Sequence, residues 1–346
     1  MGQDRAGDRD EGRLMNRMPH PGRRRALGLA SGVLLGTARR VEAQAPDPYR
    51  IVVPFPPGAA SDGIARLLAD RMLRPGAAPG SGGTVIVDNR AGAGGNLAGA
   101  QVARARPDGR TLLLTIDTTL TVNPHLYADL GYDPEVLEPV AVLGTFAQVL
   151  LAHPSSGIAS MAEFLAKARQ GGLPYASGGV GTPGQLVMEA FRLAAGLPAA
   201  ALVHVPYRGS GPALTDLVAG NVPVGFLAIS GAPEFVRSEQ VRALAVSSAE
   251  RLDTLPGVPT LGEVGFPGLD MEFANLLMAP RGLPPGLAAG IASQAIGMLR
   301  EEAVRARFAN WNLSTRAGGP AEAGEWITRA RPRWGEVVRA TGMQAG

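Results

Sequence analysis

Residues 51–66, IVVPFPPGAASDGIAR, limit what this chain can fold into more than any other stretch. An apolar run enters a proline-rich turn and then, through Ser61, a helix. This pattern predicts a strand, a tight loop and a helix N-terminus, with Ser61 as a good N-cap and Asp62 suited to the first turn. Such a junction leaves backbone N–H groups without intrahelical partners beside the positive end of the helix dipole, so it favours a bound anion. Taken alone, the stretch is more typical of an ordinary first strand-to-helix connection in an α/β domain.

The composition of the turn favours the binding interpretation. Prolines at 54, 56 and 57 stiffen it, because each ring fixes one backbone dihedral. Gly58, Ala59 and Ala60 then leave it nearly bare of side chains, so a ligand can approach the backbone closely.

Strands and helices alternate after this unit, with β-rich runs at 84–88 and 111–116 and a short helix at 99–105 between them. Such alternation predicts a mostly parallel sheet with helices on its faces, and parallel sheets bind ligands at the carboxyl ends of their strands. The loops 55–60, 91–96 and 117–123 are therefore expected at one edge.

The middle of the chain repeats the pattern. Residues 140–152 are apolar and long enough for a strand that passes from one domain to another, and the glycine loop 178–184 precedes a helical run at 185–195. The remaining expected strands are 174–177, 203–206, 222–229, 241–247 and 271–278, and the remaining expected helices are 161–170, 212–219, 286–302 and 321–339.

The N-terminus predicts export. An Arg-rich segment precedes the short apolar run 26–38, and Ala43-Gln44-Ala45 has the small-x-small form of a cleavage site. Residues 1–45 hold 9 of the 33 basic and 5 of the 30 acidic residues, so the mature chain is nearly neutral and gives no support for nucleic-acid binding. No later apolar stretch is long enough to span a membrane, and the mature protein is expected to be exported and soluble.

The usual catalytic and cofactor patterns are weak or absent. The string GVGTPG at 179–184 matches a dinucleotide pattern, but no acidic residue follows near His204 to hold a ribose. There is no cysteine and no G-x-S-x-G string, and the mature chain has only three widely spaced histidines, His125, His153 and His204. We therefore expect no cofactor, no metal site and no catalytic residues, which is typical of a binding protein.

An ordered series of motifs resembles the Bug family, the periplasmic solute receptors of tripartite tricarboxylate transporters, from residue 49 to about residue 342. The motifs are IVVPFPPG at 51–58, VIVDNRAGAGGN at 85–96, RPDGRTLL at 106–113, NPHLY at 123–127, YASGGVGT at 175–182, HVPYRGSGPALTDLVAGNV at 204–222, VRALAVS at 241–247 and LPGVPTLGEVGFPG at 255–268.

The resemblance implies a two-lobed α/β fold of the type II periplasmic-binding-protein kind, with a ligand cleft between the lobes. The leader would be 1–45, the first lobe 46–147 plus 265–346, and the second lobe 148–264. In family members the first strand-to-helix loop of one lobe and the glycine loop of the other hold a carboxylate through backbone N–H groups and water. The implied ligand-binding residues are Phe55, Pro56, Gly58, Ala59, Asp62, Ser177, Gly178, Gly179, Gly181 and Thr182.

Two of these residues have alternative roles. Phe55 would be an apolar wall against the ligand or a buried turn residue. Asp62 would orient the loop, contact a polar ligand group, or serve only at the helix start.

The sequence also departs from the family pattern. Ala59 replaces a usual glycine, Gln185 stands where histidine is common, Pro223 and Leu227 replace two aspartates, and Phe273 replaces a frequent tryptophan.

The predicted function is an exported, monomeric receptor that binds a small carboxylate and presents it to membrane permease subunits, with no chemical step. A two-lobed enzyme acting on a carboxylic acid, and a ligand sensor for a membrane signalling protein, are the alternatives that the sequence leaves open.

Overall fold

The computed structural model describes residues 48–74, 84–228 and 230–345, so the expected leader over residues 1–45 lies outside the described part of the chain. The strands are β1 (Tyr49–Val53), β2 (Val85–Asn89), β3 (Thr111–Ile116), β4 (Leu137–Phe146), β5 (Gln148–Ala152), β6 (Leu173–Ser177), β7 (Leu202–Pro206), β8 (Val224–Ala228), β9 (Arg242–Val246), β10 (Phe273–Pro280) and β11 (Ser314–Gly318). The helices are α1 (Ala60–Met72), α2 (Asn96–Ala103), α3 (Thr118–Thr121), α4 (Asn123–Leu126), α5 (Met161–Arg169), α6 (Pro183–Ala194), α7 (Ser210–Val218), α8 (Ala232–Arg237), α9 (Pro285–Met298), α10 (Glu302–Asn310) and α11 (Pro320–Thr341).

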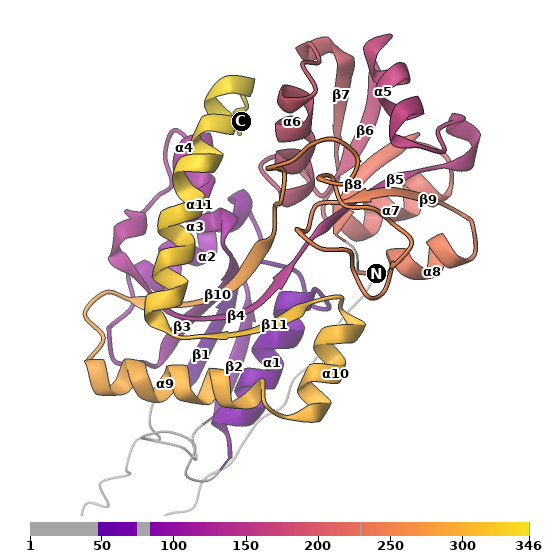
Figure 1. The fold of residues 1–346 in the computed structure, drawn as a ribbon. Coiled ribbons are helices and arrows are strands. Elements are labelled where there is room, and N and C mark those ends of the chain that lie inside the picture. Colours follow the sequence, from indigo (N-terminus) through magenta and orange to yellow (C-terminus); the bar gives the residue numbers. More distant parts are fainter. Residues whose placement is uncertain (1–47, 75–83, 229, 346) are drawn as a thin grey trace, which may run out of the picture. The chain divides into compact units, whose positions relative to one another are not determined.

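The first sheet has the order β11-β4-β10-β3-β1-β2 (Figure 1). Alternate strand residues face opposite sides, and each side has its own apolar core. Residues of α1, α9 and α10 pack on one face, with Ile51 and Leu112. Residues of α2 and α11 pack on the other, with Val52 and Leu113.

The second sheet has the order β7-β6-β8-β5-β9. Helices α5 and α6 share one apolar core with this sheet, and α7 and α8 contribute to the core on its other face. The structure therefore has the two-sheet α/β architecture that the sequence predicts.

Residues 140–152 pass from one sheet to the other, as expected. They form two strands rather than one, because Ala147 separates β4 in the first sheet from β5 in the second. The chain returns with β10, which pairs with both β3 and β4. Helix α11 also belongs to both halves, since Trp326 packs in a core of the first sheet and Trp334 in a core of the second.

The expectation of mostly parallel sheets is wrong. Only β1, β2 and β3 in the first sheet, and β6, β7 and β8 in the second, pair in parallel. The crossing strands β4, β5 and β10 are antiparallel to their neighbours, because each carries the chain between the sheets instead of following a strand-helix-strand unit. The sequence pattern also missed β11 and α10, which lie between the two expected C-terminal helices.

Among the described helices, none combines the length and the apolar character that crossing a membrane requires.

Candidate functional site

The segments that follow β1, β2 and β3 meet at the carboxyl edge of the first sheet, as predicted, because these strands run parallel and in register. The segment 117–123 is helical and not the expected loop, since α3 takes up residues 118–121 and α4 begins at Asn123. Asn123 ties this segment to the glycine cluster, since its side-chain amide donates to the carbonyl of Gly94 at 3.0 Å and to Asn96 Oδ1 at 2.7 Å.

Asp62, in the first turn of α1, holds the first loop, residues 54–59, through hydrogen bonds of its carboxylate. Its carboxylate is buried and accepts hydrogen bonds from the Gly58 N–H and from Asn89 Nδ2, both at 3.0 Å, and from the guanidinium of Arg66. Asn89 Nδ2 also donates to the Phe55 carbonyl at 2.9 Å. Burial alone would raise the pKa of Asp62, but the hydrogen bonds from Arg66, Gly58 and Asn89 outweigh it and lower the pKa below its ordinary value. An ionised Asp62 therefore orients this loop.

The N-terminus of α1 has no side-chain cap, and the expectation that Ser61 caps it is wrong. Ala59 is the N-cap residue, and Ser61 lies in the first turn, where its hydroxyl donates to Asn275 Oδ1 at 2.8 Å. Within the described part of the chain, the N–H groups of Ala60, Ser61 and Asp62 meet no hydrogen-bond acceptor. These three N–H groups therefore have no acceptor of their own, and Ala60 is the partly exposed residue of the three.

The second loop, residues 178–182, is held by a buried serine. Ser177 is 0% exposed, and its hydroxyl lies 2.7 Å from His204 Nε2 and accepts the Gly179 N–H at 3.2 Å. The His204 ring stacks on Tyr175 with centroids 5.1 Å apart. Burial lowers the pKa of His204 to about 4, so the imidazole is neutral at physiological pH.

Other polar groups of the second loop are also bonded within it. Gln185 Oε1 accepts the Gly181 N–H at 2.8 Å, and Thr182 Oγ1 donates to the Gly179 carbonyl at 2.7 Å. Thr182 is the N-cap of α6 but makes no side-chain cap. The N–H groups of Gly178 and Val180 have no acceptor among the residues that the structure describes.

The structure places the expected ligand-binding residues in two sets of five. In the first set Phe55 is partly buried, Pro56 and Gly58 are exposed, Ala59 is partly exposed and Asp62 is buried. In the second set Ser177 and Gly181 are buried, and Gly178, Gly179 and Thr182 are partly exposed. Leu126 at the end of α4 lies against the second set, because a Cβ at Gly181 would overlap its Cδ2 atom.

The residues that depart from the family pattern fit their surroundings. Ala59 has φ −66° and needs no glycine, and Gln185 holds the Gly181 N–H. Leu227 is part of an apolar core, where an aspartate would need a partner. Phe273 stacks on Trp334 with ring centroids 5.3 Å apart.

Arg208 was missed by the sequence reasoning, although it stands in the quoted motif at 204–222. Arg208 lies two residues after the end of β7. Its two neighbours are fixed to the second loop, because the Tyr207 N–H donates to the Ser177 carbonyl at 3.1 Å and the Gly209 N–H donates to the Gly178 carbonyl at 2.9 Å. Arg208 is exposed, and its guanidinium has no hydrogen-bond or ion-pair partner within the described ranges. Only the strand pairing could reveal that this cation lies beside Gly178.

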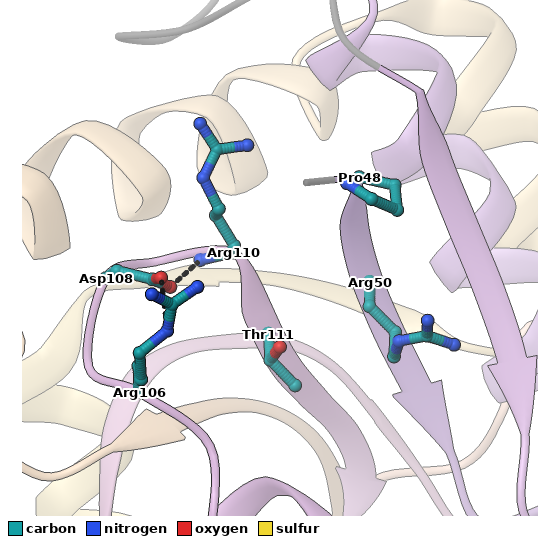
Figure 2. Close-up of a pocket in the computed structure, with 6 residues that line it drawn as sticks. All are labelled: Pro48, Arg50, Arg106, Asp108, Arg110 and Thr111. Carbon is teal, nitrogen blue, oxygen red and sulfur yellow. Dashed lines mark hydrogen bonds and ion pairs between the residues drawn. The ribbon is translucent and has the colours of Figure 1, made fainter. Parts of the chain in front are cut away.

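A separate cavity of about 220 Å³ lies at the opposite, amino edge of the first sheet (Figure 2). Its lining residues are Pro48, Arg50, Arg106, Asp108, Arg110 and Thr111. Figure 2 shows the three guanidinium groups pointing in different directions. Asp88 lies 3.1 Å from Arg50 and Asp108 lies 3.5 Å from Arg106, so two of the three arginines already have carboxylate partners. The carboxyl-edge loops are therefore the better candidate site.

No group of three or more histidine, aspartate and glutamate side chains in the described ranges is placed to hold a metal ion.

Known proteins resemble this chain over most of its length. The profile of a family described as "Tripartite tricarboxylate transporter family receptor" matches residues 64–343. Protein BugT of Bordetella pertussis is 35% identical over 301 residues, which cover 86% of this chain and 90% of BugT.

Solved structures resemble it as well. The periplasmic binding protein BugD superposes with a TM-score of 0.74 at 28% identity, over 86% of this chain and 98% of BugD. R. palustris Rpa4515 with adipate gives 0.76 at 28% identity, over 86% and 98% of the two chains. MatC from Rhodopseudomonas palustris with bound malate gives 0.74 at 29% identity, over 84% and 98%.

Proposed function

Since this chain belongs to the tripartite tricarboxylate transporter receptor family, we propose that it captures a small carboxylate in the periplasm and delivers it to membrane permease subunits. Structures of two similar proteins hold adipate and malate, which are both carboxylates. The family consists of receptors, which supports binding and release without a chemical step.

One observation supports this function most directly: both loops present open N–H groups at a helix N-terminus. The N–H groups of Ala60 and Ser61 at α1, and of Gly178 and Val180 before α6, find no acceptor in the described part of the chain. The aligned dipoles of a helix favour negative charge at this end. A carboxylate held by both loops would satisfy N–H groups from both.

The expected ligand-binding residues then divide by role. The backbone of Pro56 to Ala59 and of Gly178 to Gly181 shapes the contact surface, and Phe55 provides an apolar wall. Asp62, Ser177 and Thr182 keep the two loops in shape through the hydrogen bonds described above. Each N–H bond to a carboxylate contributes roughly 1.5–3 kcal/mol. Three such bonds approach the roughly −8 kcal/mol of a micromolar complex.

Closure of two lobes follows from this arrangement. The first lobe comprises residues 46–147 and 265–346, and the second comprises residues 148–264. A carboxylate that bridges both helix N-termini binds the closed state more tightly than the open state, so it shifts the population toward closure.

The leader 1–45 directs export and is removed, and the mature receptor acts as a monomer.

The Ser177 and His204 pair does not favour an enzyme. Their 2.7 Å separation would suit a nucleophile and its base, but Ser177 is fully buried beneath its own loop. The Ser177 hydroxyl already accepts the Gly179 N–H, so it organises the loop, and its burial keeps a substrate from reaching it.

Ligand screening of the mature chain tests the proposed function. Native mass spectrometry first establishes that the purified protein is empty, and thermal-shift assays then compare mono-, di- and tricarboxylates, aromatic acids and acidic amino acids. At a hundred times its dissociation constant a true ligand stabilises the fold by about 2.7 kcal/mol. Absence of a shift with every acid, in folded and empty protein, would overturn the proposal, and turnover of a bound acid would favour an enzyme.

A further inference from the structure

The turn that follows α10 is fixed by local hydrogen bonds. The Asn312 N–H donates to the Ala309 carbonyl at 2.9 Å, and the Leu313 N–H donates to the Phe308 carbonyl at 2.8 Å. Asn312 has φ +53°, the left-handed conformation that commonly ends a helix, and Phe308 and Leu313 are buried in one apolar core. Trp311, the C-cap of α10, therefore has a defined place, and the turn leaves its carbonyl to another donor.

The Trp311 ring lies against the first turn of α1. A Cβ at Gly63 would come within 2.5 Å of Cη2 and Cζ2 of this ring, so glycine lets the ring approach the helix. Glycine is otherwise unfavourable inside a helix, and this contact gives a reason for it. Phe55 and Ala60 are partly buried against the same apolar core as Trp311. The ring therefore supports the turn whose open N–H groups would face the carboxylate.

Ser230 reaches Trp311 from the proposed second lobe. Its hydroxyl donates to the Trp311 carbonyl at 3.1 Å. Ser230 lies two residues after the end of β8, and β8 pairs in parallel with β6, which the second loop follows. A Cβ at Gly184, in the first turn of α6, would overlap the carbonyl of Phe226 in β8, so α6 packs tightly on β8. The hydrogen bond thus joins the edges of both lobes that carry the binding loops.

A cavity of about 450 Å³ separates the lobes beside this contact. It lies between α8 and the end of α10 (Figure 1), with Glu234 and Arg237 on one side and Asn310 and Asn312 on the other. Ser230 itself is exposed. A single hydrogen bond between neutral groups beside open solvent is weak, so it can form and break as the lobes move.

We infer that the contact between Ser230 and Trp311 is a latch that holds the closed state of the two lobes, and that Trp311 is the positioning residue that couples this latch to the first turn of α1. The inference rests on the lobe closure in the proposed function and names a contact that regulates it. Opening about the crossing strands would carry Ser230 away from Trp311, because each belongs to a different lobe. The bond therefore stabilises the closed state alone, and the latch and a ligand that bridges the lobes favour each other.

The distance between two spin labels tests the latch without a ligand. The chain has no cysteine, so Glu250→Cys and Arg305→Cys place one label on each side of the cavity, both at exposed positions. Pulsed dipolar spectroscopy of this labelled protein is expected to show a short-distance population. Ser230→Ala should lower the ratio of short to long distances about fivefold, which is the effect of one hydrogen bond between neutral groups. Ser230→Thr keeps the hydroxyl and should keep the ratio.

Ser238→Ala is the matched control. Ser238 is also exposed, lies in the same lobe and donates its hydroxyl to a backbone carbonyl, that of Glu234 at 2.9 Å, but makes this bond at the end of α8. The control should leave the distance ratio within twofold of the parent protein. Absence of a short-distance population in the parent, or equal ratios in Ser230→Ala and Ser238→Ala, would overturn the latch. Neither result bears on carboxylate binding, which the ligand screen decides.

A methyl group on α1 tests the role of the ring. Gly63→Ala displaces Trp311 and should lower the distance ratio about as much as Ser230→Ala, although alanine favours the helix. Gly290→Ala in α9 is the control, since a Cβ there meets nothing within 4 Å, and it should leave the ratio unchanged. Gly63→Ala combined with Ser230→Ala should match Ser230→Ala alone, because both remove the same contact. An unchanged ratio in Gly63→Ala, or a further fall in the combined variant, would refute the positioning role, and thermal melts show that every variant is folded.

Discussion

Replacement of Asp62 by asparagine isolates the hydrogen bonds that hold the first loop. Asparagine has nearly the same shape but carries no charge, and only one of its two terminal atoms accepts hydrogen bonds. If that oxygen keeps the Gly58 N–H, the new amide nitrogen faces Asn89 Nδ2 and Arg66, which are donors as well. The variant therefore loses the Asn89 contact and the ion pair.

The expected loss of unfolding free energy is about 2 kcal/mol at pH 7, since hydrogen bonds to a charged group contribute roughly 1.5–3 kcal/mol. The Arg66 side chain is 56% exposed, so water replaces its contact and its share is small. Arg66→Gln is the matched control, with an expected loss clearly smaller than that of Asp62→Asn. Urea denaturation of both variants measures these differences.

The pH dependence gives the sharper test. The pKa of Asp62 is lower in the folded than in the unfolded chain, so its stabilisation is fully present above the unfolded value of 3.8 and is lost as the pH falls through the folded pKa. The gap between wild type and Asp62→Asn should therefore close at acidic pH. A gap that persists unchanged at low pH, or a variant as stable as wild type at pH 7, would refute the role given to Asp62.

Three further predictions concern buried and charged groups near the two loops. Burial lowers the pKa of His204 from 6.5 to about 4, so the unfolded chain binds a proton more readily than the folded one between these values. The free energy of unfolding should therefore fall by about 2 kcal/mol as the pH drops from 6.5 to 4, after allowance for the partial exposure of the ring. Urea titrations of His204→Gln should lack this fall, and an equal fall in the variant would contradict a buried neutral His204. Burial raises the pKa of Asp117 from 3.8 to about 7, so its ionisation opposes folding as the pH rises through this range. Asp117→Asn keeps an acceptor for Trp326 Nε1 and should be about 2 kcal/mol more stable than wild type at pH 8 but no more stable at pH 4, as denaturant melts would show. Arg208→Gln should slow ligand association and weaken its salt dependence in stopped-flow measurements while the melting temperature stays unchanged, and an unaltered salt dependence would argue against a role for this cation.

The order of elements could be predicted from sequence because local patterns carry it. Met161–Arg169 shows why: Ser160 accepts the Glu163 N–H at the N-cap, and a glycine pair follows the helix, so both ends are specified locally. The directions of β4, β5 and β10 have no such local signal. These directions depend on which sheet each strand joins, and packing between segments at least 72 residues apart decides which sheet that is.

The difference between local signals and long-range contacts also explains why the N-cap of α1 was predicted wrongly. Ser61 has the right chemistry for an N-cap, but its hydroxyl donates to Asn275, 214 residues away, and the N-cap lies two residues earlier, at Ala59. The result is an α1 N-terminus whose N–H groups have no side-chain cap, and an uncapped helix end needs another acceptor. The departure from the expected cap therefore strengthens the case that an anion completes this site, because a capping serine would have occupied an N–H group that a carboxylate can use.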